Sequence, residues 1–152
     1  MESVLRQQTS GNGSPVEEPK PNNIFVVPVD SMLSFFRWWC VMLRPFVPLT
    51  DREMDVMASF LKQRWDLSKT IFDAAMIDTV LMSEDIKKKV IKECGISLQH
   101  FYVVMSTLKK KKVINGNIIN PKLIPNTRDT DNGVFQLRIM FKEDKPKHKD
   151  AA

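Results

Sequence analysis

The chain contains little of the side-chain chemistry on which enzymes and metal sites depend. Its 152 residues include two cysteines and two histidines. Cys40 and Cys94 have no metal-ligand spacing, and we interpret both as reduced core residues of an intracellular-type protein. His148 lies in a polar tail, and His100 has no evident carboxylate or thiol partner. A lone histidine on a helix is usually structural or solvated, so we expect no catalytic residue, no metal and no cofactor.

Glycine and long apolar runs are also scarce. The five glycines form no loop of the kind that cradles phosphate groups. The apolar run over residues 32–43 is shorter than the roughly 20 residues that a membrane-spanning helix needs, and no secretory pattern opens the chain. We therefore expect a soluble protein that is neither secreted nor transmembrane, with no membrane partner and no small-molecule substrate.

Positive charge is concentrated in one part of the sequence. Residues 83–112 contain eight lysines against three acidic residues, which leaves +5, the formal charge of the whole chain. Such a patch attracts nucleic acid, acidic proteins or membrane surfaces, and a solvated lysine-rich helix face explains it equally well. The eight are Lys87, Lys88, Lys89, Lys92, Lys109, Lys110, Lys111 and Lys112.

Apolar spacing and capping residues predict a mainly α-helical domain over residues 31–142. The first helix, residues 31–44, is apolar almost all round, which predicts burial on both sides or one half that faces a partner. Thr50 and Glu53 form the sequence pattern of a capping box. We expect Ser68 to cap a further helix with Ile71, Phe72, Ala75, Met76 and Val80 inside. Ser83 and Ser97 are expected to cap the last two helices.

After the last predicted helix, the sequence pattern becomes that of β-strands. Asn115-Gly116 is a strong hairpin signal, and residues 134–141 alternate in the manner of a strand, with a loop over residues 127–133 between them. Residues 1–22 are expected to be disordered, and residues 143–152 form a polar tail. Residues 23–30 form an apolar extended arm, which packs either on its own core or on a neighbouring chain.

Three helices followed by a hairpin is the order of the winged helix-turn-helix, and "KECGIS" (residues 92–97) has the spacing of its turn. The sequence resembles the C-terminal helix-turn-helix of LuxR-type regulators and sigma-factor region four, over roughly residues 49–114. The stretches that carry the resemblance are "LTDREMDVM" and "SEDIKKKVIKECGISLQHFYVVMSTL". The resemblance implies a winged helix-turn-helix domain with a small β-wing. It says little of function, because these scaffolds have many roles.

A wider stretch is similar to small conserved proteins of crAss-like and related bacteriophages. It runs from "FFRWWCVMLRPFVPLTDREMDVMASFLKQRW" (residues 35–65) to "SLQHFYVVMSTLKKKKVINGNIINPKLIPN" (residues 97–126). This resemblance implies a phage component, including a virion component, located in the virion or in the host cytoplasm.

The helix that follows the turn has the position of a recognition helix but poor chemistry for reading bases. The helix-turn-helix resemblance implies that Leu98, Gln99, His100, Tyr102, Val103 and Ser106 face outward. Bases are read mainly by Arg, Lys, Asn and Gln, and of these residues only Gln99 is suited. Outward apolar side chains suit a protein interface better. Alternatively, Tyr102 and Val103 pack on the first helix or on the arm.

These observations leave two hypotheses for function. The first is a non-enzymatic structural subunit of a phage particle, of the neck, connector or tail-ring type, that contacts copies of itself or other phage structural proteins. Its expected interface residues are Ile24, Phe25, Val26, Val27, Trp38, Trp39, Leu98, Tyr102 and Val103. The alternative is a DNA-binding transcription regulator or DNA-packaging factor. Its expected contacts are Lys87, Lys88, Lys89, Gln99, His100, Lys109, Lys110, Lys111 and Lys112.

Overall fold

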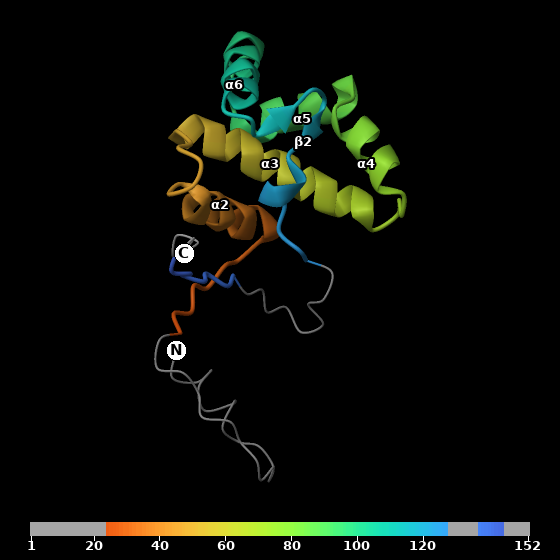
Figure 1. Ribbon diagram of the computed structural model, residues 1–152. Helices are drawn as coiled ribbons and strands as arrows, with labels where there is room; N and C mark the ends of the chain where they lie inside the picture. The colour runs from red at the N-terminus through yellow and green to blue at the C-terminus, as the bar shows by residue number, and fades with distance from the viewer. Residues whose placement is uncertain (1–23, 128–136, 145–152) are drawn as a thin grey trace, which may run out of the picture.

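The computed structural model describes residues 24–127 and 137–144 of the chain, and within these ranges it is mainly helical, as predicted (Figure 1). Five helices are followed by a small antiparallel hairpin and a short 3-10 helix. The expected tail over residues 1–22, all but the first two residues of the expected tail over residues 143–152, with His148, and most of the expected loop lie outside the described residues. The elements are α2 (Met32–Leu43), α3 (Asp51–Ser68), α4 (Ala74–Leu81), α5 (Glu84–Cys94), α6 (Leu98–Lys110), β1 (Ile114–Asn115), β2 (Ile118–Ile119) and η1 (Pro121–Leu123).

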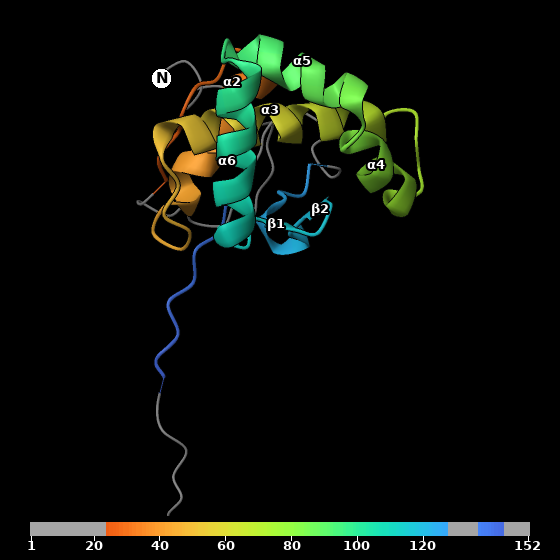
Figure 2. The same cartoon turned by 90° about the horizontal axis from the view of Figure 1, so that it is seen from above.

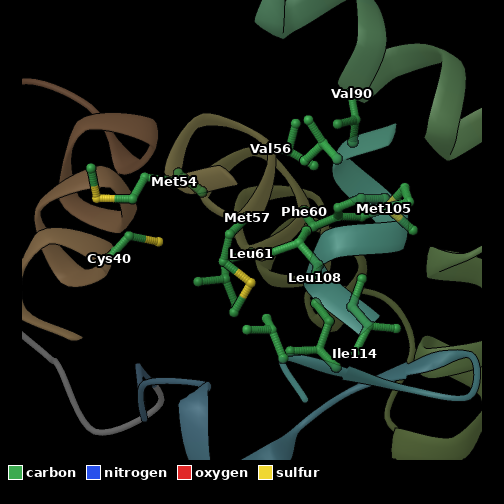
Figure 3. Packing of buried hydrophobic residues seen from close by; sticks show 14 of the residues in the cluster. Cys40, Met54, Val56, Met57, Phe60, Leu61, Val90, Met105, Leu108 and Ile114 are labelled. Atoms are coloured by element: carbon green, nitrogen blue, oxygen red, sulfur yellow. The ribbon is translucent and has the colours of Figure 1, made fainter. Parts of the chain in front are cut away.

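Helix α3 lies at the centre and packs against α2, α4, α5 and α6. Every residue from Val56 to Leu61 is buried, so this stretch is covered on all sides, as expected of a helix surrounded by others. Figure 3 shows Val56 beside Val90 of α5 and Phe60 beside Met105 of α6. The small residues of this stretch, Ala58 and Ser59, are buried together with the large apolar ones.

Side-chain caps begin α3, α5 and α6 where the sequence predicted them. The Thr50 hydroxyl accepts from the Glu53 amide at 3.2 Å, and the Glu53 carboxylate accepts from the Thr50 amide at 2.9 Å, which completes the capping box. Ser83 and Ser97 accept from amides in the first turns of α5 and α6. Each cap satisfies an amide that has no partner within its helix.

Gly95 makes the turn between α5 and α6. Its φ is +64°, in the left-handed region, and its amide donates to the carbonyls of Ile91 and Lys92 at the end of α5. Two residues later Ser97 caps α6. The turn that the sequence predicted over residues 92–97 therefore ends α5 with a left-handed glycine, the usual residue at this position.

Replacing Gly95 by alanine should lower the free energy of unfolding by about 1 kcal/mol, because left-handed backbone is unfavourable for a residue with a Cβ. An added Cβ would meet no atom within 4 Å, so backbone strain is the whole effect. Gly95→Asn should cost less, since asparagine tolerates this conformation. Urea denaturation of both variants measures the difference. A loss of stability that is equal for the two would contradict this explanation.

The boundary between α3 and α4 differs from the prediction. Helix α3 continues to Ser68, whose hydroxyl donates to the Trp65 carbonyl, and Asp73 is the cap of α4 instead. Ile77 and Leu81 are the buried residues of α4, whereas Phe72 is 85% exposed and Met76 is also exposed. The expectation that Phe72, Ala75 and Met76 face inward was wrong. Apolar residues occur on several sides of this short helix, so their spacing in the sequence could not indicate which side is buried.

The hairpin is confirmed, and the predicted strand after it is not. Ile114 pairs with Ile119 and Asn115 with Ile118, so the two loop residues are Gly116 and Asn117. Gly116 has a φ of +64°, which glycine adopts without strain. Residues 137–141 form no strand and are exposed, and residues 134–136 lie outside the described ranges. Each strand of the hairpin is two residues long, so a third strand would find few backbone groups with which to pair.

Helix α2 is covered on one side. Phe36 and Cys40 are buried, whereas Trp38 and Met42 are exposed. Of the two alternatives for this helix, burial on both sides is therefore not what the structure shows, since Trp38 and Met42 keep one side partly open to solvent. No helix in residues 24–127 or 137–144 is long and apolar enough to cross a membrane.

Candidate functional site

The outer side of α6 carries the candidate site. Phe101, Val104, Met105 and Leu108 direct one side of the helix into the core, so the residues between them face solvent. Leu98 is 58% exposed, Tyr102 46% and Val103 57%. The alternative in which Tyr102 and Val103 are covered by the first helix or by the arm is therefore not what this structure shows.

The two ends of this exposed side differ in chemistry. The first turns of the helix carry Leu98, Tyr102 and Val103, and Gln99 and His100 are exposed beside them. Ser106 is exposed at the middle, and Lys109 and Lys110 are exposed at the end. We call this set the α6 face: Leu98, Gln99, Tyr102, Val103, Ser106, Lys109 and Lys110.

The position of the α6 face separates it from the other exposed apolar segments. Both views place α6 and α2 on opposite sides of α3 (Figures 1 and 2). The arm, residues 24–30, is exposed throughout and leaves from the start of α2. Residues 137–144 also lie on the α2 side (Figure 1). The predicted interface residues thus fall on two opposite sides of the molecule.

Lys111 does not belong to an open basic surface. Its Nζ lies 2.6 Å from the Glu53 carboxylate and donates to the Pro48 carbonyl at 2.6 Å. Glu53 is 4% exposed. Burial alone would raise the pKa of Glu53, but hydrogen bonds from Lys111, the Thr50 backbone and Thr107, together with the charge of Lys111, hold it below the ordinary value of 4.5. This pair joins the start of α3 to the end of α6.

The other lysines form two groups on different helices. Lys109, Lys110 and Lys112 are exposed around the end of α6. Lys87, Lys88 and Lys89 lie in the first half of α5, where Lys88 and Lys89 are exposed and Lys87 makes an ion pair with Glu84 at 3.7 Å. Of the seven lysines predicted to contact DNA, five are therefore exposed.

The two tryptophans predicted at an interface have different surroundings. Trp38 is exposed on α2. Trp39 is half-buried, and its Nε1 donates to the Leu123 carbonyl at 2.8 Å, which fastens η1 to α2. Trp39 therefore has a structural contact within the chain, whereas Trp38 is available to a partner.

A hollow of about 410 Å³ between α2, α3 and α5 contains polar residues that are already paired. The Arg37 guanidinium lies 2.8 Å from Asp55. The Ser59 hydroxyl donates to Glu93 at 2.7 Å, and Lys62 lies 2.6 Å from the same carboxylate. Ser59 is fully buried, so no substrate reaches its hydroxyl. These contacts stabilise the packing of three helices.

The thiols are free and unreactive in character. Burial raises the pKa of Cys40 to about 12 and that of Cys94 to about 11, so neither is a thiolate near neutral pH. Among the residues that the structure describes, no group of three His, Cys, Asp or Glu side chains could hold a metal ion.

Two features of the structure were missed or misassigned from the sequence. The Glu53–Lys111 pair joins residues far apart in the chain, and no local pattern indicates it. The apolar alternation of residues 134–141 was assigned to a strand, and residues 137–141 form none.

Comparison with known proteins adds no relative. No family model, no curated protein and no solved structure matches the chain.

Proposed function

We propose that the chain is a winged helix-turn-helix scaffold that acts as a non-enzymatic protein–protein assembly module. In the setting implied by the resemblance to phage proteins, it is a structural subunit of a virion, of the neck, connector or tail-ring type. The observation that carries the proposal is the exposure of Leu98, Tyr102 and Val103 together on the first turns of α6.

The chemistry of the α6 face supports protein over DNA as the partner. Covering Leu98, Tyr102 and Val103 removes apolar area from water, which stabilises association by about 25 cal/mol per Å². Tyrosine is enriched at the energetic centres of protein interfaces. A base-reading helix instead presents Arg, Lys, Asn or Gln to base edges, and on these turns Gln99 is the residue of that kind.

The lysines support the alternative, a DNA-binding regulator or packaging factor. Lys109 and Lys110 end the same exposed side of α6, at a position suited to backbone phosphates. Such contacts give affinity without sequence preference. In that alternative Gln99 and His100 contact the bases, and Lys88 and Lys89 of α5 add to the charge.

The experiment that separates the two functions is a photo-crosslink from the α6 face. Tyr102 is replaced by a photoreactive phenylalanine analogue in the full chain, produced in its native setting, and the adduct is identified by mass spectrometry. We expect an adduct with protein. The same analogue at Phe72, which is exposed on a different part of the surface, is the control and should give no specific adduct.

A different outcome would favour the alternative. An adduct with DNA alone, together with DNA binding that falls steeply with salt and is lost in Lys109→Glu/Lys110→Glu, would overturn the assembly proposal. Loss of DNA binding on charge reversal without an adduct from position 102 would place DNA at the lysines and not on the apolar turns.

A further inference from the structure

The end of α6 and the segment that follows it carry positive charge with no acidic residue beside it in the sequence. Residues 95–127 contain five lysines and neither aspartate nor glutamate. Lys111 is taken by the buried carboxylate of Glu53. The other four lysines are exposed and make no ion pair with any residue that the structure describes. We call these four the basic end: Lys109, Lys110, Lys112 and Lys122.

Hydrogen bonds of one side chain hold two of these lysines together. The Asn120 side chain accepts from the Lys122 amide at 3.1 Å, and its Nδ2 donates to the Lys112 carbonyl at 3.4 Å. The hairpin between these lysines packs against the end of α6 (Figure 2). Lys122 therefore lies near Lys112 although the whole hairpin separates them in the chain, and the basic end is one continuous surface.

Lys112 occupies a backbone position that favours glycine. Its φ is +66°, and the other two described residues in this left-handed region are Gly95 and Gly116. The Lys112 amide donates to the Lys109 carbonyl at 3.1 Å, a hydrogen bond of the helix-end motif in which this position is usually glycine. A lysine here carries backbone strain that glycine would relieve, which points to a role for its charge.

The basic end continues the apolar turns of the α6 face. Lys109 and Lys110 follow Tyr102 and Val103 along the same exposed side, about 10 Å further at 1.5 Å per residue. A partner that covers this surface therefore needs apolar side chains and negative charge close to each other. A protein segment with acidic and aromatic or aliphatic residues has both. A phosphate backbone supplies the charge but no apolar surface for these turns.

We propose that the α6 face and the basic end together bind an acidic, apolar segment of a partner protein. The proposal rests on the proposed function, since it names the chemistry of the partner that the assembly module binds. Carboxylates of the partner lie against the basic end, and its apolar side chains cover Leu98, Tyr102 and Val103. Charge steers the encounter and apolar contact stabilises the complex, so binding depends on both parts of the surface.

Two synthetic polymers separate the charged part of the contact from the apolar part. The full chain is titrated with a labelled random copolymer of glutamate and tyrosine, with polyglutamate and with a DNA duplex, and fluorescence anisotropy is recorded at several salt concentrations. The copolymer should bind about tenfold more tightly than polyglutamate, and more tightly than the duplex. Tighter binding of the duplex through the same residues, or no binding of the copolymer at low salt, would overturn the proposal.

Paired charge removals locate the binding surface. Lys109→Gln/Lys110→Gln should weaken copolymer binding about tenfold. Lys88→Gln/Lys89→Gln removes the same charge from exposed positions on α5 and should weaken it less than about twofold. Tyr102→Ser/Val103→Ser should reduce copolymer binding to the level of polyglutamate. Equal losses for the two lysine pairs would mean that net charge alone matters, and the proposal would fail.

Substitutions at Lys112 should change stability and binding in opposite directions. Lys112→Gly should raise the urea midpoint, because glycine adopts the left-handed conformation without strain, and should weaken copolymer binding about threefold. Lys112→Arg keeps the charge and should leave both quantities as in the wild type. A Lys112→Gly chain that is more stable and binds the copolymer as tightly as the wild type would contradict a role for this charge in the contact.

This inference and the proposed function fail in different ways. A photo-crosslink from position 102 to a protein peptide without acidic residues supports the assembly module and overturns the chemistry of its partner. An adduct within an acidic, apolar stretch of a protein, together with the copolymer result, supports both. An adduct with DNA alone overturns both.

Discussion

Phe101→Ala should remove a large part of the stability of this domain, with a loss of about 4 kcal/mol in the free energy of unfolding. Phe101 is fully buried on α6, and its ring centroid lies 6.1 Å from that of Phe60 on α3. Truncation removes the apolar contact between these helices and leaves a cavity in a close-packed core. Since domains of this size are stable by only about 5–15 kcal/mol, the urea midpoint should fall sharply.

The same substitution elsewhere in the chain is the control. Phe72→Ala removes the same atoms from a side chain that is 85% exposed, so it should change stability by no more than about 0.5 kcal/mol. Equal losses for the two variants would contradict the placement of α6 on α3. A small loss for Phe101→Ala alone would mean that the core rearranges to fill the cavity.

Lys111→Met should lower stability by about 2 kcal/mol near neutral pH, because it leaves the buried Glu53 carboxylate without its cation. Methionine keeps the apolar part of the side chain and removes the charge. Lys110→Met, one residue earlier and exposed, is the matched control and should change stability by less than about 0.5 kcal/mol. Urea denaturation of the two variants decides between a structural lysine and a merely solvated one.

The cost of Lys111→Met should depend on pH and on Glu53. The pKa of Glu53 is lowered in the folded chain, so its stabilising effect is present above the unfolded value of 4.5 and is lost as pH falls through the folded value. The difference between wild type and Lys111→Met should therefore shrink below pH 4.5. Adding Glu53→Gln to Lys111→Met should recover part of the loss, because no buried charge remains. A pH-independent difference would contradict the ion-pair explanation.

The four lysines at residues 109–112 show which parts of the candidate site could be predicted from the sequence and which could not. The turn at Gly95 and the cap at Ser97 fix where α6 begins, and the helix-turn-helix resemblance implied that Leu98, Tyr102 and Val103 face outward, where the structure leaves them exposed. In the sequence, however, Lys109 to Lys112 are four identical residues. Lys111 differs from its neighbours because Glu53 and Pro48 of a distant segment lie beside it, and no pattern within α6 contains that information.

The local features of this protein follow from short stretches of its sequence. The capping box at Thr50, the caps at Ser83 and Ser97, the left-handed glycine at residue 95 and the hairpin at Gly116 each depend on hydrogen bonds or backbone preferences within a few residues. These interactions have the same partners whatever the rest of the chain does, so the sequence alone predicts them.

The tertiary structure decided which apolar surfaces are covered. Helix α3 became the buried centre, α2 kept Trp38 exposed, and α4 buried Ile77 and Leu81 while Phe72 remained in water. Residues 137–141 have a strand pattern but remain exposed. The physical reason is that burial depends on which surfaces other segments offer. An apolar pattern predicts that a side chain is buried. Which segment buries it is known only from the packed chain or from a neighbouring copy.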